Sequence, residues 1–342
     1  MAIEFKREVE YSRILNPASN FEEKSTPVEF RYDPLTGDMG SVWEYRPVKL
    51  AKPDLADLVA KSLEIGCPFC PENVEKVTPK FTPDFLPEGR IKVGKAIAFP
   101  NVQPYVVHSG LAIFSSQHFF ALSDFTEDTI ADGLLVSQAY LKTVIEHEPE
   151  ARYCVINWNY MPPSGGSQIH PHLQLLVERF PLAYHKKLME GSKSYYMQNG
   201  TNYWSDLIAE EKRLNERYIA TIGDTVWLTS FVPKSGFLDV TAIFQENESL
   251  LTLSAKDIND FCSGLTKVFN YMDDQDYYSF NLCLYSGIIG ENHFWTQARL
   301  VQRYYVPPLN VSDINPFQIL LEVMPIYKRP ESVCQEIKNN FY

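Results

Sequence analysis

The sequence predicts an α+β fold made of two similar lobes. Strand-like and helix-like segments follow the same order twice, first between residues 95 and 177 and again between residues 225 and 301. In each half, two strands precede an amphipathic helix, and a strand, a turn and a last strand follow it. The segments that lead into the two helices, Leu122–Asp128 and Leu253–Asp260, both begin with Leu-Ser. Such a repeat predicts a duplicated fold, with an amino-terminal lobe at 1–224, a carboxy-terminal lobe at 225–342 and one degenerate site.

The composition is typical of a globular protein with a sizeable core. Of 342 residues, 45% are hydrophobic and 22% are charged, which suits one large domain or two packed ones. The formal net charge of −12 argues against a nucleic-acid partner, because phosphate backbones are bound by basic faces. No apolar run approaches the ~20 residues that span a bilayer, and the first residues lack the apolar core of a signal peptide. We therefore expect a cytoplasmic protein without membrane contacts.

The first sixty residues predict a turn and then a strand. Proline, glycine and aspartate within Asp33–Asp38 favour a tight reversal, and Gly40–Tyr45 alternates as a strand does. The strand leads to Arg46 and Lys49. On spacing alone, these two charges fit a solvated surface and a phosphate-binding site equally well.

A Cys-x-x-Cys pair follows at Cys67 and Cys70. Six cysteines are too few for a disulfide scaffold in a chain of this length, so the pair indicates metal binding or redox chemistry. The neighbouring prolines favour a tight knuckle that turns both sulfurs toward one point, and no βαβ unit surrounds the pair, which disfavours the redox interpretation. His118, at the end of a predicted strand, is a candidate third ligand. The other cysteines are interpreted as buried packing residues: Cys154, Cys262, Cys283 and Cys334.

The repeated elements follow from hydrophobic periodicity. The first helix is expected to start at a Thr126 cap and to run to about Glu146, because apolar residues recur at helical spacing. A charged segment between the lobes, Leu207–Tyr218, is interpreted as a helical insert. Alternating or apolar runs predict strands at Lys95–Asn101, Gly110–Phe114, Tyr153–Asn159, Leu173–Val177, Thr225–Phe231, Asp239–Phe244, Tyr277–Gly287 and His293–Val301.

The most informative stretch is Ser164–Gln174, which contains the run Gly-Gly-Ser-Gln-Ile-His-Pro-His-Leu-Gln. On an extended segment, His170 and His172 project to the same side, and the proline between them stiffens the chain. The two glycines allow a sharp turn and a close approach of backbone N–H groups to an anion. The stretch therefore predicts a phosphate site with an imidazole aimed into it. The alternative is a strand that enters a turn with two half-exposed histidines.

Taken together, these motifs resemble the galactose-1-phosphate uridylyltransferase family, the duplicated branch of the histidine-triad (HIT) superfamily. The resemblance rests on the Cys67-Cys70 knuckle, His118, the His170-Pro-His172 run and Arg31–Gly37, which is similar to the family's amino-terminal Arg-x-x-Pro-Leu-Thr-Gly signature. It extends over most of the chain. It implies two HIT-like lobes, each an antiparallel sheet with helices on one face, in a half-barrel-like duplicated architecture.

The resemblance also implies roles for individual residues. His172 stands where the family has the nucleophile that carries a nucleoside monophosphate as a phosphoramidate, and an imidazole suits this because it is largely neutral near pH 7. Gln174 and Ser167 match residues that contact the phosphate. The other implied substrate contacts are Arg46, Lys49, Asn101, Asn159, Gly165, Gly166, Phe317 and Lys328.

Cys67, Cys70, His118 and His170 match the four ligands of a structural zinc site, which leaves no open position on the metal. The second, iron site of many family members is not expected, since Trp295–Arg303 lacks the His-x-His pair. The family further implies a homodimer whose active site is completed by the partner chain.

Departures from the family pattern bear on the substrate. Pro316 replaces a lysine in Asn315–Glu322, which resembles the strand that holds the hexose, Lys328 replaces a glutamine that meets the sugar, and Val102 replaces an acidic residue near the nucleoside. The expected activity is transfer of UMP or AMP from an NDP-sugar or related anhydride to a sugar phosphate or phosphate.

The alternatives within this chemistry are an ADP-sugar phosphorylase and an adenylylsulfate:phosphate adenylyltransferase. A different class, a non-catalytic zinc-stabilised nucleotide-binding module, is less favoured, since His172, Gln174 and Ser167 are all present.

Overall fold

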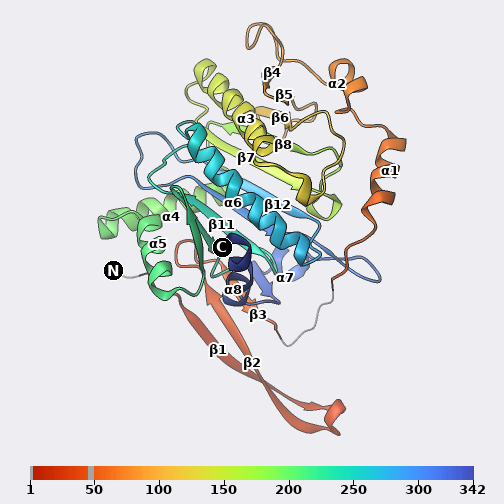
Figure 1. The fold of residues 1–342 in the computed structure, drawn as a ribbon. Helices are drawn as coiled ribbons and strands as arrows, with labels where there is room; N and C mark the ends of the chain where they lie inside the picture. Colours follow the sequence, from red (N-terminus) through yellow and green to blue (C-terminus); the bar gives the residue numbers. More distant parts are fainter. Residues whose placement is uncertain (1–2, 45–49) are drawn as a thin grey trace.

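A computed structural model describes residues 3–44 and 50–342, and a ten-stranded sheet forms its centre (Figure 1). The strand order is β4-β5-β6-β8-β7-β12-β13-β11-β10-β9. Read inward from its two edges, the sheet shows the same order twice, and the two halves meet where β7 pairs with β12. Neighbouring strands run antiparallel throughout. The predicted α+β duplication is confirmed, with the two lobes fused into one continuous sheet.

The predicted strands of this sheet are present, but three strands and not two precede the long helix in each half, because the edge strands β4 and β9 were not predicted. The first half contains β4 (Ile91–Val93), β5 (Ala96–Pro100), β6 (His108–Ile113), β7 (Tyr153–Tyr160) and β8 (His172–Glu178). The second half contains β9 (Tyr218–Ile222), β10 (Thr225–Thr229), β11 (Asp239–Phe244), β12 (Phe280–Tyr285) and β13 (Gln297–Gln302). The lobe boundary after residue 224 stays a prediction. Through its pairing with β10, β9 belongs to the second half of the sheet.

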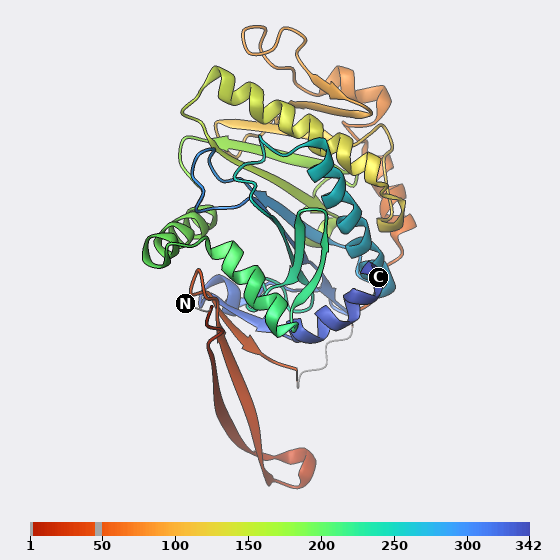
Figure 2. The ribbon, with the colours of Figure 1, turned by 60° about the vertical axis from the view of Figure 1, so that its left-hand side comes forward.

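Two long helices cover one face of the sheet, one in each half (Figures 1 and 2). Helix α3 (Glu127–His147) is capped by the Thr126 hydroxyl, as predicted, and α6 (Ala255–Asp274) is capped by Ser254. Their apolar stripes and the sheet residues beneath them form one large core. The chemistry-bearing side chains of β8 must therefore use the opposite face of the sheet.

That opposite face is covered only in part. Helices α4 (Ala183–Asn199) and α5 (Tyr203–Leu214) pack with β10 and β11 in a second, smaller core. The expected insert at Leu207–Tyr218 was therefore wrong in extent: two helices are present, and the second ends earlier. Asn215 adopts a left-handed conformation with φ 54° and stops α5, after which the chain enters β9.

A smaller sheet with the order β1-β2-β3-β16 lies at the end of the molecule opposite β4 and β5 (Figure 1). The predicted turn at Asp33–Asp38 joins β2 to β3, and the Asp33 carboxylate accepts hydrogen bonds from the Leu35 and Thr36 amides. The strands are β1 (Arg7–Asn16), β2 (Glu22–Tyr32), β3 (Met39–Val42) and β16 (Val323–Ile326).

The remaining elements are short connectors and a terminal helix. They comprise α1 (Leu55–Ile65), α2 (Pro71–Val77), α7 (Pro316–Ile319), α8 (Pro330–Phe341), β14 (Tyr305–Val306), β15 (Val311–Ser312) and 3-10 turns at Pro17–Ser19, Leu122–Asp124 and Pro162–Ser164. Within the described ranges, no helix has the length and apolar character needed to cross a membrane.

A buried ion network joins the small sheet to the large one. Arg31 on β2 is fully buried, and its guanidinium donates two hydrogen bonds, of 2.9 and 3.1 Å, to the Glu331 carboxylate on α8. Arg217, which precedes β9 and is also fully buried, donates to the same carboxylate at 2.8 Å. Burial alone would raise the pKa of Glu331, but Arg31 and Arg217 lower it to about 2. Arg31, the arginine of the amino-terminal signature, thus helps to hold the structure together through its contact with Glu331.

Replacing Glu331 with glutamine is expected to lower the free energy of unfolding by about 3 kcal/mol at pH 7, because two buried guanidinium groups lose their shared anion. The folded-state pKa is depressed, from an ordinary 4.5 to about 2, so this contribution is present above pH 4.5 and is lost as the pH falls toward 2. Urea unfolding of both proteins at several pH values measures it.

The matched control is Glu216→Gln, since Glu216 contacts Arg217 at 2.9 Å but its side chain is 44% exposed. We expect its effect to stay below ~1 kcal/mol. Equal losses in the two variants would contradict the assignment of stability to the half-buried Glu331 carboxylate.

Candidate active site and metal centre

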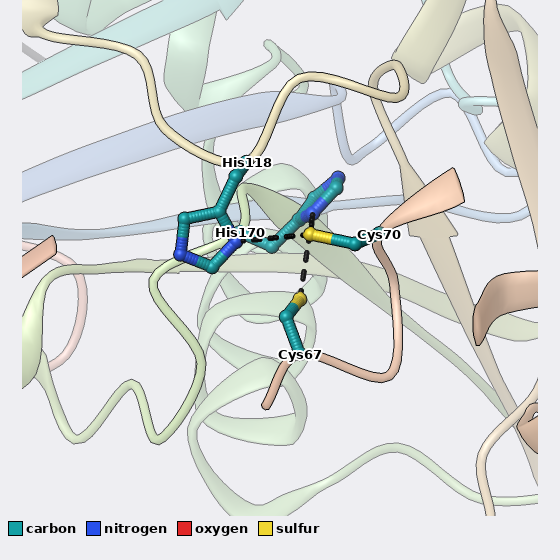
Figure 3. Close-up of side chains that lie close together, drawn as sticks. All are labelled: Cys67, Cys70, His118 and His170. Carbon is teal, nitrogen blue, oxygen red and sulfur yellow. Dashed lines mark hydrogen bonds between the residues drawn. The ribbon is translucent and has the colours of Figure 1, made fainter. Parts of the chain in front are cut away.

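Four side chains from separate parts of the chain point toward one another beside β8 (Figure 3). Cys67 and Cys70 both precede α2, which Cys70 caps and whose first turn Pro71 occupies. His118 comes from the loop after β6, and His170 lies just before β8. Their ligand atoms all lie within 4.8 Å of one another. The structure thus brings together the four residues that the sequence proposed as metal ligands.

Hydrogen bonds orient both imidazoles toward the sulfurs. His170 Nε2 lies 2.9 Å from the carbonyl oxygen of Ser115, which can only accept, so the proton is on Nε2 and Nδ1 is free to bind a cation. His118 Nε2 lies 2.7 Å from Ser62 Oγ, whose own proton is donated to a backbone carbonyl of α1. Outer contacts of this kind are the usual way in which metal-binding histidines are held.

The donor set fits one tetrahedral metal ion. Bond lengths typical of Cys₂His₂ sites place sulfur and nitrogen about 3.6 Å apart, and the sulfur–Nδ1 distances here are 3.6 Å for Cys67–His170, 3.3 Å for Cys70–His118 and 4.0 Å for Cys70–His170. Burial and the adjacent Cys67 thiol raise the pKa of Cys70 to about 12. A cation between the sulfurs is what would favour the thiolate forms. This Cys₂His₂ cluster can therefore bind a metal through four protein ligands.

His172 is the first residue of β8 and is only 7% exposed. Its Nδ1 lies 2.9 Å from the carbonyl oxygen of His170, so Nδ1 carries the proton and donates it. The lone pair of the neutral ring is then on Nε2. Burial lowers the pKa of His172, while the bond to the His170 carbonyl opposes the shift. The ring is thus a neutral imidazole with a fixed tautomer, the form that a nucleophile requires.

Phe69, inside the Cys-Pro-Phe-Cys knuckle, connects the metal cluster to His172. Its ring centroid lies 5.9 Å from that of His170 and 5.3 Å from that of His172. The phenylalanine is buried, so it fixes the two imidazoles from one side. The knuckle therefore positions His172 through packing as well as through the backbone of residues 170–172.

A cavity of 260 Å³ opens in front of His172. Ser167, Gln174 and Asn101 line it, so three of the predicted substrate contacts share one space with the predicted nucleophile. Val102, which was expected near the nucleoside, also lines it. The remaining lining side chains were not foreseen: Pro68, Phe69, Val77, Thr78, Pro79, Phe99, Pro100, Gln103, Tyr105, Leu111 and Gln168. Among the described residues, no carboxylate lines this cavity, which leaves polar amides, hydroxyls and apolar walls to receive a ligand.

The glycine turn beside the cavity is held from the second half of the sheet. Gly165 has φ +83°, a left-handed conformation that other residues rarely adopt, and a side chain on Gly166 would lie 3.3 Å from the Asn159 carbonyl oxygen. Asn281 on β12 donates hydrogen bonds to Asn159 Oδ1 at 2.7 Å and to the Ser164 carbonyl oxygen at 2.9 Å. It connects the turn to the strand that carries Asn159.

Asn281 was missed by sequence reasoning. Asn281 and Asn159 face each other across the β7–β12 pair, a register that no local motif reveals. Arg303 Nη1 donates to Asn281 Oδ1 at 2.7 Å and fixes the orientation of the amide. The only indication of this contact was that the predicted strand at Tyr277–Gly287 mirrors the one at Tyr153–Asn159.

Two predicted substrate contacts, Arg46 and Lys49, lie outside the described residues. Two others, Phe317 and Lys328, are not brought to His172. Phe317 packs edge-on against Trp43, with centroids 4.9 Å apart, and Lys328 forms an ion pair with Glu336 on α8. Neither of them lines the 260 Å³ cavity.

The strand expected within Asn315–Glu322 was wrong, because this segment contains the short helix α7. The Asn315 side chain caps it, and Pro316 occupies its first turn. Gln318, Ile319 and Glu322 instead line a separate cavity of 490 Å³ together with residues of β12 and β13.

The mirrored position in the second half carries different chemistry. Arg299 is the third residue of β13, as Gln174 is of β8. Its guanidinium forms an ion pair with Asp239 at 2.7 Å and donates to the Tyr184 hydroxyl, also at 2.7 Å. An internal ion pair and α4 thus occupy the face that the first half leaves open.

No known protein-family profile matches the chain. An uncharacterized protein of Archaeoglobus fulgidus is 30% identical over 338 residues, which cover 98% of each chain. Among solved structures, a GalT-like protein from Arabidopsis thaliana has a TM-score of 0.70 at 16% identity and covers 90% of this chain and 98% of its own.

Two enzymes have similar scores. An ADP-glucose phosphorylase from Arabidopsis thaliana, solved with bound ADP-glucose, has a TM-score of 0.69 at 17% identity, with coverage of 91% and 98%. A uridylyltransferase has a TM-score of 0.67 at 16% identity, with coverage of 91% and 97%. The chain therefore belongs to the same family as the uncharacterized protein of Archaeoglobus fulgidus and has the duplicated GalT-like fold that its sequence motifs indicate.

Proposed function

We propose that the chain is a nucleotidyltransferase that carries a nucleoside monophosphate on His172. The observation that carries the proposal is the tautomer of this residue: Nδ1–H donates to the His170 carbonyl, which leaves the Nε2 lone pair for attack. The residue borders a cavity that also contains Ser167 and Gln174. A uridylyltransferase and an ADP-glucose phosphorylase with the same fold lend the proposal further support.

The reaction has two displacement steps. Nε2 attacks the α-phosphorus of a nucleoside diphosphate compound, a P–N bond forms, and the bond to the departing phosphate oxygen breaks with its electron pair. An oxygen of the acceptor phosphate then attacks the same phosphorus, and the P–N electron pair returns to Nε2. During the intermediate, the Nδ1–H bond to the His170 carbonyl stabilises the cationic ring.

Ser167 and Gln174 are proposed to hold the phosphoryl oxygens, together with backbone N–H groups of the Gly165–Gly166 turn. Such donors act by positioning and by stabilising developing charge. Asn101 and Asn159 are proposed to contact the nucleotide. Asn281 is a positioning residue, since it contacts the turn and Asn159.

Inorganic phosphate is a candidate acceptor beside a hexose 1-phosphate. Pro316 and Lys328 replace the lysine and the glutamine that the resemblance places near the hexose. A phosphorylase acting on an ADP-sugar or on adenylylsulfate is therefore the second candidate, beside a hexose-1-phosphate uridylyltransferase.

We further propose a homodimer, in which Arg46, Lys49, Phe317 and Lys328 complete the active site of the partner chain. The placement of Phe317 and Lys328 away from the cavity in the same chain supports this arrangement.

The proposed metal in the Cys₂His₂ cluster is zinc, bound in a structural role. Four protein ligands leave no open coordination position, so a bound zinc ion would brace His170 and the knuckle.

Purified protein, never exposed to chelators, is expected to contain about one zinc per chain by elemental mass spectrometry, and Cys70→Ser is expected to lose most of it. Cys154→Ser is the control, since Cys154 is also buried but lies outside the cluster. Metal-free wild-type protein, or equal zinc contents in the two variants, would rule out this site.

Incubation with UDP-glucose, ADP-glucose or adenylylsulfate, without an acceptor, is expected to add one uridylyl or adenylyl group to wild-type protein. Intact mass spectrometry identifies the base from the mass added. His172→Gly should take up no label, because the only proposed nucleophile is gone. His147→Gln, which changes a partly exposed histidine on α3, should label like wild type. Labelling of His172→Gly at the wild-type level would refute the assignment.

Asn281→Leu is expected to lower kcat by about 10- to 100-fold, because the turn and Asn159 lose their shared donor and small displacements of positioning groups are costly. The KM for the nucleotide donor and the zinc content should change much less. Steady-state kinetics with whichever donor labels His172 provides the measurement. Asn340→Leu on α8 serves as the control, and a wild-type kcat for Asn281→Leu would refute the positioning role.

A further inference from the structure

The hairpin of β1 and β2, hereafter the arm (residues 7–32), extends far from the rest of the molecule (Figures 1 and 2). Its first strand, β1, is ten residues long, and every residue but the last is exposed. Large apolar side chains are among them, with Val9 49%, Tyr11 65% and Leu15 64% exposed. These three lie on the same face of the arm, since they alternate along one strand. The arm thus presents apolar surface that nothing in the described chain covers.

The arm also has free backbone edges. β1 is an edge strand, and β2 pairs with β3 only from Glu29 onward, so most of the arm is a ribbon of two strands. A two-stranded ribbon is at best marginally stable in water, and three or more strands are needed for independent stability. A long exposed edge is a template for pairing with another strand. We therefore expect a further strand to pair with the arm.

The two edges differ in their ability to pair. On β2, Pro27 lies in the free part of the arm and has no backbone N–H, which is a known protection of edge strands. β1 contains no proline between Arg7 and Asn16 and keeps its full set of donors. The available edge is therefore the one on β1.

Symmetry restricts how β1 could pair with itself. Residues that oppose each other in an antiparallel pair of strands lie on the same face of the sheet. If a twofold axis relates the two strands, it must therefore pass through a position where one residue opposes the same residue of the second copy. An axis at Val9, Glu10 or Arg13 brings like charges opposite each other, as Glu8 to Glu10, Glu10 to Glu10 or Arg13 to Arg13. Like charges in directly opposed positions are destabilising.

An axis at Ser12 avoids these conflicts and makes favourable pairs. Val9 then opposes Leu15 of the second copy, and Tyr11 opposes Arg13. Apolar pairs and a guanidinium beside an aromatic ring are both stabilising arrangements. An axis at Tyr11 also avoids like charges, but it opposes Val9 to Arg13 and Leu15 to Arg7. An axis at Ile14 pairs only Ser12–Asn16 and opposes Arg13 to Leu15. The axis at Ser12 opposes Glu10 to Ile14, but it makes the most favourable pairs of the registers compared.

We propose that β1 pairs with β1 of a second copy of this chain about a twofold axis at Ser12, forming a four-stranded sheet with the order β2-β1-β1-β2. This inference rests on the proposed homodimer, for which it supplies an interface. Val9, Tyr11 and Leu15 of both copies then share one face of this sheet. The arm is an interaction surface whose occupant is the same arm of the other copy.

Ser12→Cys tests the register. Opposed residues of an antiparallel pair have Cα atoms about 4.5–5.5 Å apart, which is within the range that a disulfide bridges. Under mild oxidation, Ser12→Cys should form a covalent dimer at least ~10-fold faster than Ser25→Cys, which makes the same change in an exposed residue of β2. Wild-type protein, treated identically, shows whether the native cysteines contribute.

Ser12→Glu tests the interface without a covalent bond. It places two carboxylates on the axis, so the dimer dissociation constant from sedimentation equilibrium should rise at least ~10-fold, while Ser25→Glu should leave it unchanged. A dimeric wild type in which neither Ser12 variant differs from its Ser25 control would overturn the pairing of the arms and leave the homodimer intact. A monomeric wild type would overturn both. Labelling of His172 tests the chemistry independently of either result.

Discussion

The hydrogen bond from His172 Nδ1 to the His170 carbonyl is the constraint on which the chemistry depends. At 2.9 Å it sets the tautomer of the second histidine, and its acceptor belongs to the first, whose ring points into the Cys₂His₂ cluster. Proline between the two limits the freedom of the backbone. The carbonyl oxygen of Ser115 accepts a hydrogen bond from the ring of His170, so a chain of contacts runs from the loop after β6 to His172, the proposed nucleophile. Disturbing any part of it would move Nε2.

The duplicated sheet accounts for the asymmetry of the molecule. Both halves have the same strand order and one long helix on the same face, yet only the first leaves its opposite face open at the start of its last strand. In the second half, Arg299 and Asp239 pair beneath Tyr184, and α4 and α5 complete a core there. The second half stabilises the first where β7 pairs with β12, because Asn281 on β12 donates a hydrogen bond to the glycine turn. One lobe therefore holds the site and the other stabilises it.

Local patterns were sufficient for much of the fold. The cap at Thr126, the turn at Asp33 and the strands β10 and β11 are decided by nearest neighbours along the chain, and each was predicted within a few residues. The metal ligands were also recognisable, because cysteine and histidine in a knuckle have few alternative roles. The resemblance to a known family supplied what spacing could not, namely the prediction that His172 and not His170 is the nucleophile.

The features that could not be predicted from the sequence depend on contacts between segments that are far apart along the chain. Asn281 faces Asn159 because of the register in which β12 pairs with β7, and nothing in the sequence of β12 itself indicates this contact. Phe317 was expected on a strand, but an asparagine cap and a proline in the first turn favour a helix, and a local rule thus overrode the family pattern. The apolar walls of the cavity, such as Tyr105, come from a loop whose path only the folded chain defines.

The arm adds a feature that the fold of one copy does not require. Its exposure and its free edge are evident only in three dimensions. The distribution of charge along β1 then gives the exposed edge a specific register.

The proposed chemistry requires that Nε2 of His172 forms a covalent bond to phosphorus. This bond can be observed by trapping the nucleotidyl protein without an acceptor, isolating the peptide that contains residues 170–174, and identifying the modified nitrogen by phosphorus and proton NMR. We expect a phosphoramidate at Nε2 of His172. A phosphoramidate at Nδ1, or a label on any other residue, would contradict it.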